Sequence, residues 1–427
     1  MAGEKVLVIE INEFNTDLLR KAADELDLKS LKRVLSFRTG STMADQEHEH
    51  HGLDPWVQWV SVHTETPSQE HEVIRLGDVT KLKHTQIWER IGREGWTTGV
   101  WGVMNASRSN AKNNLFFVAD PWTFSERPFP ENVSGFLQLP GYFAKNYLAP
   151  SKSRLLGSAL KTSAYLLRNI PLSKLISDGW YLARNVLRTG VNTAVLFGAY
   201  ELMSARVFAK FRKAHNPDAN IIFLNSIAHF QHHDWESGGH LDATGEFVFK
   251  TIDRVLSFVL PKEGADVKIL VLNGLSQRNV SDEDFYIYRQ IDPLRFLERL
   301  NLKPVSVEQC MTNDAHVFFA TKEERDNAAR ILSTGHIEGQ NAFYVEVDQF
   351  DDTKLFYQLA FWDEVDMKAP LTVGNHLMRF DEEFAVHAKR TGEHVPEGTY
   401  FAAGVEMPAR VPNSHVLRHI WPLGAAA

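Results

Sequence analysis

Cysteine is almost absent from this sequence, and the single Cys310 cannot form a disulfide within the chain. A cysteine-rich zinc site is therefore excluded. The lack of disulfides is typical of proteins in a reducing compartment, although the fold could also simply not need them. We expect a cytoplasmic protein.

Long apolar runs are lacking as well. The best one, Thr193 to Tyr200, is far too short to cross a bilayer. The opening MAGEKVLVIEI lacks the basic start, the longer apolar core and the small-residue cleavage site of a secretory signal, so we interpret it as leading into a strand. Internal repeats and low-complexity linkers are not found either.

Basic residues are concentrated in one part of the chain. The 427 residues include 46 Lys and Arg against 54 Asp and Glu, which gives a net charge of −8. Between Pro140 and Asn216, however, only Asp178 and Glu201 oppose twelve basic residues. This segment has a charge near +10 and the remainder has one near −18. Such an asymmetry indicates an anionic partner, although a solvated amphipathic surface is the alternative.

The full chain is 44% hydrophobic, which is typical of a globular protein with a large core. Outside the basic segment, strand and helix patterns alternate. The run VLVIEI at 6–11 predicts a buried strand, and a helix over 15–26 follows, with Asn15 as its N-cap. Further strands are predicted at 99–103, 221–224 and 267–272. This alternation predicts an α/β fold with a doubly wound, mostly parallel sheet, whose ligand site lies at the carboxyl ends of the strands.

Two segments interrupt this pattern. Residues 140–215 show helical spacing without strand signals, and we interpret them as a basic helical insertion broken near Pro171 and Gly190. Residues 282–365 predict a small α+β subdomain. The α/β core then consists of 1–139, 216–281 and 366–423.

Four segments, in order, resemble the type I phosphodiesterase and nucleotide pyrophosphatase branch of the alkaline phosphatase superfamily. They are 6–15 (VLVIEINEFN), 59–103 (WVSVHTETPSQEH to TGVWGV), 223–277 (FLNSIAHFQHHDW to VLNGLSQ) and 391–407 (TGEHVPEGTYFAAGVEM). The resemblance implies an alkaline phosphatase-like fold in which the basic insertion is a cap. It also implies a site where Asp and His ligands hold two divalent metals, usually zinc, around a Thr or Ser nucleophile.

The resemblance places asparagine where the family has three metal-binding aspartates, at Asn12, Asn225 and Asn273. Of the family's ligands only His229 and His394 remain. A neutral amide is a weak zinc ligand, so we do not expect a conventional two-zinc site; one divalent ion, zinc or manganese, or none, is the expectation. The pocket is still expected to bind a ligand through its amides.

Several side chains are candidates for roles in a rebuilt site. Asp54 lies beside the family's nucleophile position and is a candidate nucleophile or base. Glu13 is a candidate base or substitute metal ligand, and a carboxylate at the start of a helix is the alternative. His229 and His394 are the predicted metal ligands. The predicted substrate-binding residues are Asn12, Asn225, Asn273, Gln277 and His232. For His48, His50 and His51 an exposed loop is favoured over a metal site.

These patterns leave three functions open. The first is a phosphoester or sulfoester hydrolase or transferase with a rebuilt site. The others are a catalytically inactive relative that binds an anionic ligand or partner, and a metal-independent transferase on the same scaffold. The expected substrate is an anionic small molecule, lipid-linked molecule or glycan. No nucleic acid is expected, and the basic insertion is a candidate for peripheral contact with an anionic membrane face.

Overall fold

The computed structural model describes residues 5–45, 53–109, 111–146, 151–309, 313–348 and 351–421. His48, His50, His51 and Cys310 lie outside these residues. The chain forms two compact units, the larger from Met1–Arg278 with Glu393–Ala427 and the smaller from Asn279–Gly392.

An eight-stranded sheet with the order β20-β2-β19-β6-β1-β5-β3-β4 forms the centre of the larger unit. The strands are β1 (Lys5–Ile11), β2 (Arg38–Met43), β3 (Thr98–Val103), β4 (Asn114–Ala119), β5 (Ala219–Leu224), β6 (Val267–Leu272), β19 (Glu397–Ala403) and β20 (Arg410–Pro412). Strands β6, β1, β5, β3 and β4 run parallel, and β19 is antiparallel to both β6 and β2. This order confirms the predicted doubly wound, mostly parallel sheet.

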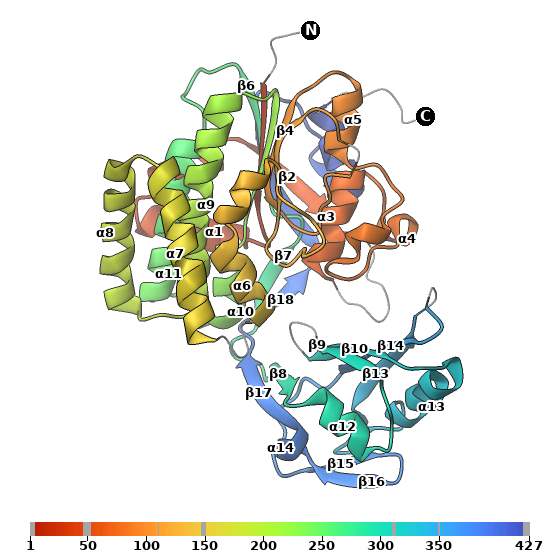
Figure 1. Cartoon of the computed structure of the whole chain (residues 1–427). Coiled ribbons are helices and arrows are strands. Elements are labelled where there is room, and N and C mark those ends of the chain that lie inside the picture. Colours follow the sequence, from red (N-terminus) through yellow and green to blue (C-terminus); the bar gives the residue numbers. More distant parts are fainter. Residues whose placement is uncertain are drawn as a thin grey trace. The chain divides into compact units, whose positions relative to one another are not determined.

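Both faces of the sheet are covered, because alternate side chains of each central strand enter different cores. Leu7, Ile9 and Ile11 of β1 pack into one hydrophobic cluster, whereas Val6 and Val8 pack into the other. The first cluster contains side chains of α1 (Thr16–Glu25), α2 (Lys29–Leu35), α9 (Thr193–His215), α10 (Ser226–His233) and α11 (Ala243–Val259). The second contains side chains of α3 (Pro55–Thr64), α5 (Ile87–Arg93) and the short helix η4 (Asn413–His419). Figure 1 shows the two groups of helices on opposite sides of the strands.

The basic segment is helical. It contains α6 (Gln138–Asn146), α7 (Lys152–Asn169), α8 (Leu172–Thr189) and α9. Pro171 precedes α8 and Gly190 follows it, so the predicted breaks coincide with the helix ends. Of these helices, α8 and α9 pack against α11, in the group of helices on one side of the sheet in Figure 1. Within the described residues, no helix has the length and apolar character needed to cross a membrane.

The smaller unit has a core of its own, and its two larger sheets have the strand orders β13-β14-β10-β9 and β12-β11-β15-β16. Its strands are β8 (Tyr286–Gln290), β9 (Ser306–Gln309), β10 (Asp314–Phe318), β11 (His336–Ile337), β12 (Gln340–Asn341), β13 (Phe343–Val347), β14 (Lys354–Leu359), β15 (Pro370–Val373), β16 (His376–Arg379) and β17 (Phe384–Lys389). Its helices are α12 (Pro293–Arg299), α13 (Lys322–Leu332) and α14 (Phe380–Glu383).

The smaller unit extends beyond the predicted boundary at 365. The structure places residues 366–392 in it, whereas the sequence assigned them to the α/β core. The reason is strand pairing over long sequence separations: β15 pairs with β11, and β17 pairs with β8 about 100 residues earlier. The chain then passes into β18 (Gly392–Val395), which forms a two-stranded sheet with β7 (Ser276–Asn279).

Candidate metal centre

The site is built on the loop that follows β1, at the carboxyl end of the sheet. Glu13 in this loop has a φ of 58°, in the left-handed region that non-glycine residues rarely adopt. Its amide N–H donates to the carbonyl of Asn273 at 3.1 Å, and its carbonyl accepts from Nε2 of Gln231 at 2.9 Å. These bonds hold the carboxylate of Glu13 inside the protein, where the residue is only 2% exposed.

Two histidine side chains from distant segments converge at this carboxylate. Nε2 of His232 on α10 and Nε2 of His394 on β18 each lie 2.9 Å from Oε2 of Glu13. The two Nε2 atoms are 3.3 Å apart. One carboxylate oxygen and two imidazole nitrogens therefore form a triangle of potential metal ligands, all in the larger unit.

The size of this triangle fits a metal ion. Zinc bonds of about 2.0–2.1 Å in a tetrahedral arrangement separate the ligand atoms by roughly 3.3 Å. The three observed separations of 2.9, 2.9 and 3.3 Å are equal to or slightly below that value. Imidazole with carboxylate also suits zinc, and carboxylate suits manganese. The residues present thus fit a single divalent ion.

The electrostatics of the triangle keep the carboxylate charged. Burial raises the pKa of Glu13, but the positive charges of His394 and His232 and their hydrogen bonds together lower it, so that this pKa is well below its ordinary value. A deprotonated carboxylate is the form that binds a metal.

Two amides orient Glu13. Nδ2 of Asn12 donates to Oε1 of Glu13 at 2.6 Å, and Nε2 of Gln277 donates to Oε2. Nε2 of Gln277 also lies 3.1 Å from Nε2 of His232. The other amide atom, Oε1 of Gln277, is buried and has no hydrogen-bond partner among the described residues.

The three asparagines predicted to bind substrate all use their side chains within the protein. Oδ1 of Asn12 accepts from Nε1 of Trp59 at 2.7 Å, and its Nδ2 also donates to Oδ1 of Asn225 at 2.8 Å. Nδ2 of Asn273 donates to the carbonyl of Phe14, while its Oδ1 accepts from the backbone N–H of Thr399, both at 2.8 Å. An aspartate could not make these donations, so the substituted amides stabilise the loop after β1.

His229 and Asp54 lie outside the triangle. Nε2 of His229 is 3.3 Å from Nδ2 of Asn225, and its ring stacks on Phe197 with a centroid separation of 3.6 Å. Asp54 directly precedes α3, the helix whose Trp59 donates to Asn12. Of the two predicted metal ligands, the structure therefore brings His394 to Glu13, together with His232, which the sequence assigned to substrate binding.

Two further buried residues, Gln231 and Glu201, support this region. Gln231, completely buried, accepts from the N–H of Asn15 and donates to the carbonyl of Glu13. Glu201 of α9 accepts from the N–H and hydroxyl of Ser226 and from the N–H of Asn225. Burial raises the pKa of Glu201 to about 7, although these hydrogen bonds act in the opposite direction. No sequence pattern marked either residue, because both act through contacts between distant segments.

No protein-family model matches the chain, and no curated protein matches it by sequence. Solved structures that resemble it include phosphonoacetate hydrolase from Sinorhizobium meliloti in complex with phosphonoformate. That match has 12% sequence identity and a TM-score of 0.44, and it covers 96% of this chain and 94% of that chain. Human ectonucleotide pyrophosphatase/phosphodiesterase 5 is similar at 11% identity with a TM-score of 0.45. The match covers 99% of this chain and 96% of that chain. The murine form of the latter protein, in complex with AMP, has a TM-score of 0.44 at 11% identity.

Proposed function

We propose that this protein is a phosphoester or sulfoester hydrolase that uses one divalent ion in place of the superfamily's two. The observation that carries this proposal is the convergence of Glu13, His232 and His394 on one point, with ligand-atom separations of 2.9–3.3 Å. The substrate class follows from the four sequence segments that resemble the superfamily.

In this proposal the chain's own residues have separate tasks. Glu13, His232 and His394 hold the ion, and Asn12 and Gln277 orient the carboxylate of Glu13. When bound, a divalent ion supplies Lewis-acid polarisation of a phosphoryl or sulfuryl oxygen. Asp54, at the start of α3, is the proposed nucleophile or general base.

Metal binding by the purified protein tests the ion site. The chain stripped by a chelator should bind one zinc or manganese ion in a calorimetric titration. His232→Ala and His394→Ala should each weaken binding by about 100-fold or more, because two ligands remain. The matched control is His419→Ala, an exposed histidine of the same unit, which should leave binding unchanged. Two tightly bound ions, or none, would contradict the proposal.

Turnover of aryl phosphates, phosphodiesters and sulfate esters by the metal-loaded protein tests the chemistry. Asp54→Asn should abolish turnover while the titration still shows one bound ion. If turnover persists in this variant, Asp54 has no role in the reaction.

A second function is favoured by the three asparagines. Their neutral amides form hydrogen bonds to other groups of the protein. The network around Glu13 therefore contains few charged groups besides Glu13 itself. A protein that binds an anionic ligand without turnover would have the same features. One bound ion together with binding but no hydrolysis of phosphate and sulfate esters would favour this second function.

A further inference from the structure

Helices α7 and α8 expose an unusual number of large hydrophobic side chains. Those of α7 are Leu156, Leu160 and Leu167, each more than 60% exposed. On α8 the corresponding residues are Leu172, Ile176, Trp180 and Leu187, of which Trp180 is 74% and Leu187 88% exposed. Contiguous apolar side chains on a surface mark a site of interaction.

These side chains form a stripe along each helix. Residues 172, 176 and 180 are spaced by four, and 187 follows seven later, so all four lie on one side of α8. Residues 156, 160 and 167 have the same spacing on α7. The opposite side of α8, which contains the buried Asp178 and Asn185, packs against the protein. The apolar stripes are therefore additional to the faces that form the core.

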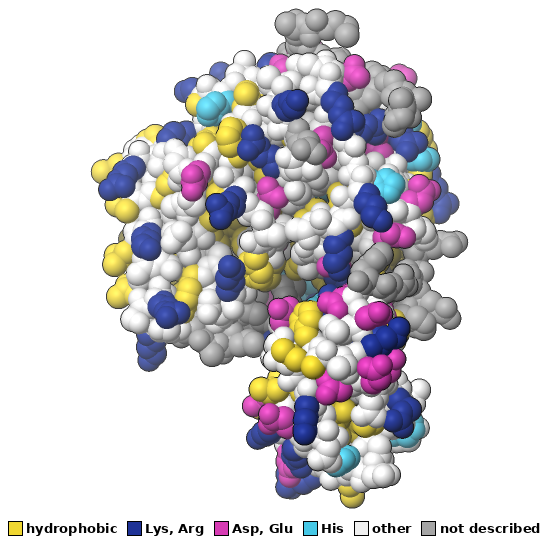
Figure 2. Space-filling model, turned by 45° about the vertical axis from the view of Figure 1, so that its right-hand side comes forward, with side chains coloured by type: hydrophobic (Ala, Val, Ile, Leu, Met, Phe, Trp, Pro, Cys, Tyr) yellow, Lys and Arg dark blue, Asp and Glu magenta, His cyan; other side chains and the backbone are white. Residues whose placement is uncertain are grey.

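Cations accompany both stripes. Helices α7 and α8 contain seven Lys and Arg and one acidic residue, Asp178. Within the described part of the chain only Arg188 among these seven forms an ion pair, with Glu246 at 3.5 Å. The remaining cations are Lys152, Arg154, Lys161, Arg168, Lys174 and Arg184. Figure 2 shows hydrophobic and basic side chains interspersed over this helical part of the larger unit.

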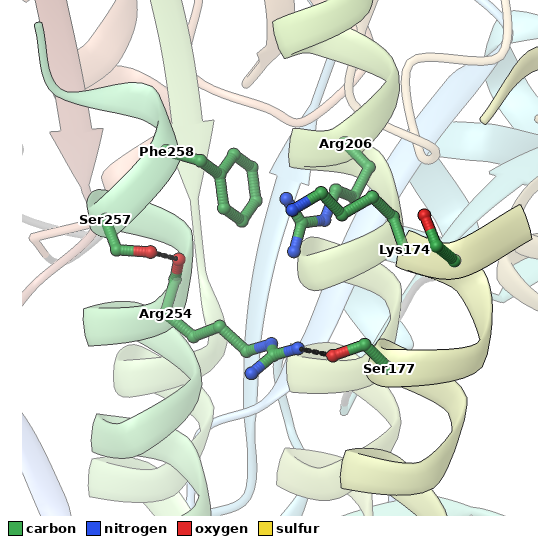
Figure 3. Close-up of a pocket in the computed structure, with 7 residues that line it drawn as sticks. Lys174, Ser177, Arg206, Arg254, Ser257 and Phe258 are labelled. Atoms are coloured by element: carbon green, nitrogen blue, oxygen red, sulfur yellow. Dashed lines mark hydrogen bonds between the residues drawn. The ribbon is translucent and has the colours of Figure 1, made fainter. Parts of the chain in front are cut away.

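A polar pocket of about 390 Å³ lies beside the α8 stripe, between α8, α9 and α11. Lys174, Arg206 and Arg254 line it together with three serines (Figure 3). The buried carboxylate of Asp178 accepts from Nε of Arg206 at 2.7 Å and from Nε of Arg254 at 2.8 Å. One carboxylate thus pairs with two of the three cations, and the pocket keeps a positive charge next to the apolar stripe.

We propose that the outer faces of α7 and α8 dock on an anionic phospholipid bilayer. The apolar stripes enter the boundary between headgroups and acyl chains, with Trp180 at the interface, while the cations and the pocket bind headgroup phosphates. The positive charge of α7 and α8 is complementary to the negative charge of such a membrane. A second copy of the chain would place two strongly basic faces against each other, which is unfavourable. This surface is independent of the proposed metal centre.

Flotation of the full chain with vesicles tests the proposal. The chain should bind vesicles of phosphatidylcholine mixed with phosphatidylglycerol, and bind pure phosphatidylcholine only weakly. Adding salt should release it, whereas free glycerol phosphate should not, because the apolar stripes need a bilayer. The variant Ile176→Ser/Trp180→Ser should bind about tenfold more weakly, and Arg184→Gln roughly fivefold more weakly.

Matched controls keep the outcome interpretable. Val305→Ser/Leu377→Ser removes two equally exposed hydrophobic side chains of the smaller unit and should bind vesicles normally. Far-UV circular dichroism and thermal unfolding of each variant report whether the chain remains folded. The proposal is overturned if the chain does not bind anionic vesicles, if both double variants bind alike, or if Ile176→Ser/Trp180→Ser instead dissociates a dimer in sedimentation. Vesicle binding needs no bound ion, so the flotation result still tests the membrane proposal if the metal titration fails.

Discussion

Glu13 is the residue on which the candidate metal centre depends, and its backbone has an unfavourable left-handed conformation. A left-handed conformation costs a non-glycine residue roughly 1–2 kcal/mol. Hydrogen bonds from Gln231 and to Asn273 hold that backbone, and two amides hold the carboxylate. Strained residues that are held by surrounding contacts cluster at functional sites. The geometry of Glu13 is therefore consistent with a functional role rather than a structural one.

Asn12→Asp should destabilise the metal-free protein by about 2–3 kcal/mol at neutral pH. The new carboxylate would lie beside that of Glu13, and the donation to Asn225 would be lost. Urea denaturation measures the change, and Asn341→Asp, on an exposed strand, is the control. An unchanged midpoint would show that the amide of Asn12 is not required.

Glu201 predicts a dependence of stability on pH. Its pKa is raised to about 7 in the folded protein, from an ordinary value near 4.5. Between these values the folded state binds more protons than the unfolded state, so the contribution of Glu201 to stability is present below pH 4.5 and is lost as the pH rises through about 7. Glu201→Gln should therefore be at least as stable as the native chain at pH 8. Urea denaturation of both chains from pH 5 to 8 measures the difference, and a difference that does not vary with pH would refute the assignment.

At the scale of secondary structure, the short helix α10 both contributes to the candidate metal centre and supports it. Nε2 of His232 is one of the three potential ligand atoms, and the adjacent Gln231 connects Glu13 and Asn15. Glu201 of α9 accepts from the N–H groups at the start of this helix. The position of α10 relative to β1 thus determines whether the ligands meet.

Gln231→Ala should weaken zinc binding about tenfold, since it removes contacts that hold the loop carrying Glu13. It should also cost about 1–3 kcal/mol of stability, because buried backbone groups lose their partners. Gln309→Ala is a matched control, since Gln309 donates to the carbonyl of Gln290 in the smaller unit. Calorimetric zinc titrations of both variants provide the comparison, and equal affinities would show that Gln231 does not position Glu13.

At the scale of the whole molecule, the two compact units have separate hydrophobic cores. The clusters on the two faces of the eight-stranded sheet belong to the larger unit, and the cluster around Phe296 and Phe343 belongs to the smaller one. The ligand triangle lies entirely in the larger unit. Loss of packing in the smaller core should therefore stay local.

Phe296→Ala should destabilise the smaller unit by about 3–5 kcal/mol, because this side chain is completely buried among Phe343 and Phe384. Hydrogen exchange measured by mass spectrometry should accelerate in 279–392, while zinc affinity stays at the native value. Faster exchange throughout the α/β sheet would indicate instead that the units unfold together.

The sequence by itself determined the class of the fold, and it predicted that the loop after β1 belongs to the candidate site. Strands such as 6–11 are recognisable because their apolar residues are contiguous, and Asn15 caps α1 as its position predicted. Local patterns of this kind need only neighbouring residues. The end of the smaller unit was not predictable in the same way, because β17 finds its partner β8 about 100 residues away.

Only the tertiary structure decided which histidine meets Glu13. His229 and His232 are three residues apart on the same short helix, so the sequence offers both to the site. The packing of α10 against α9 places the ring of His229 on Phe197 and turns His232 toward His394. Which side of a helix faces a ligand depends on contacts with segments far away in the sequence, and these contacts exist only in the folded chain.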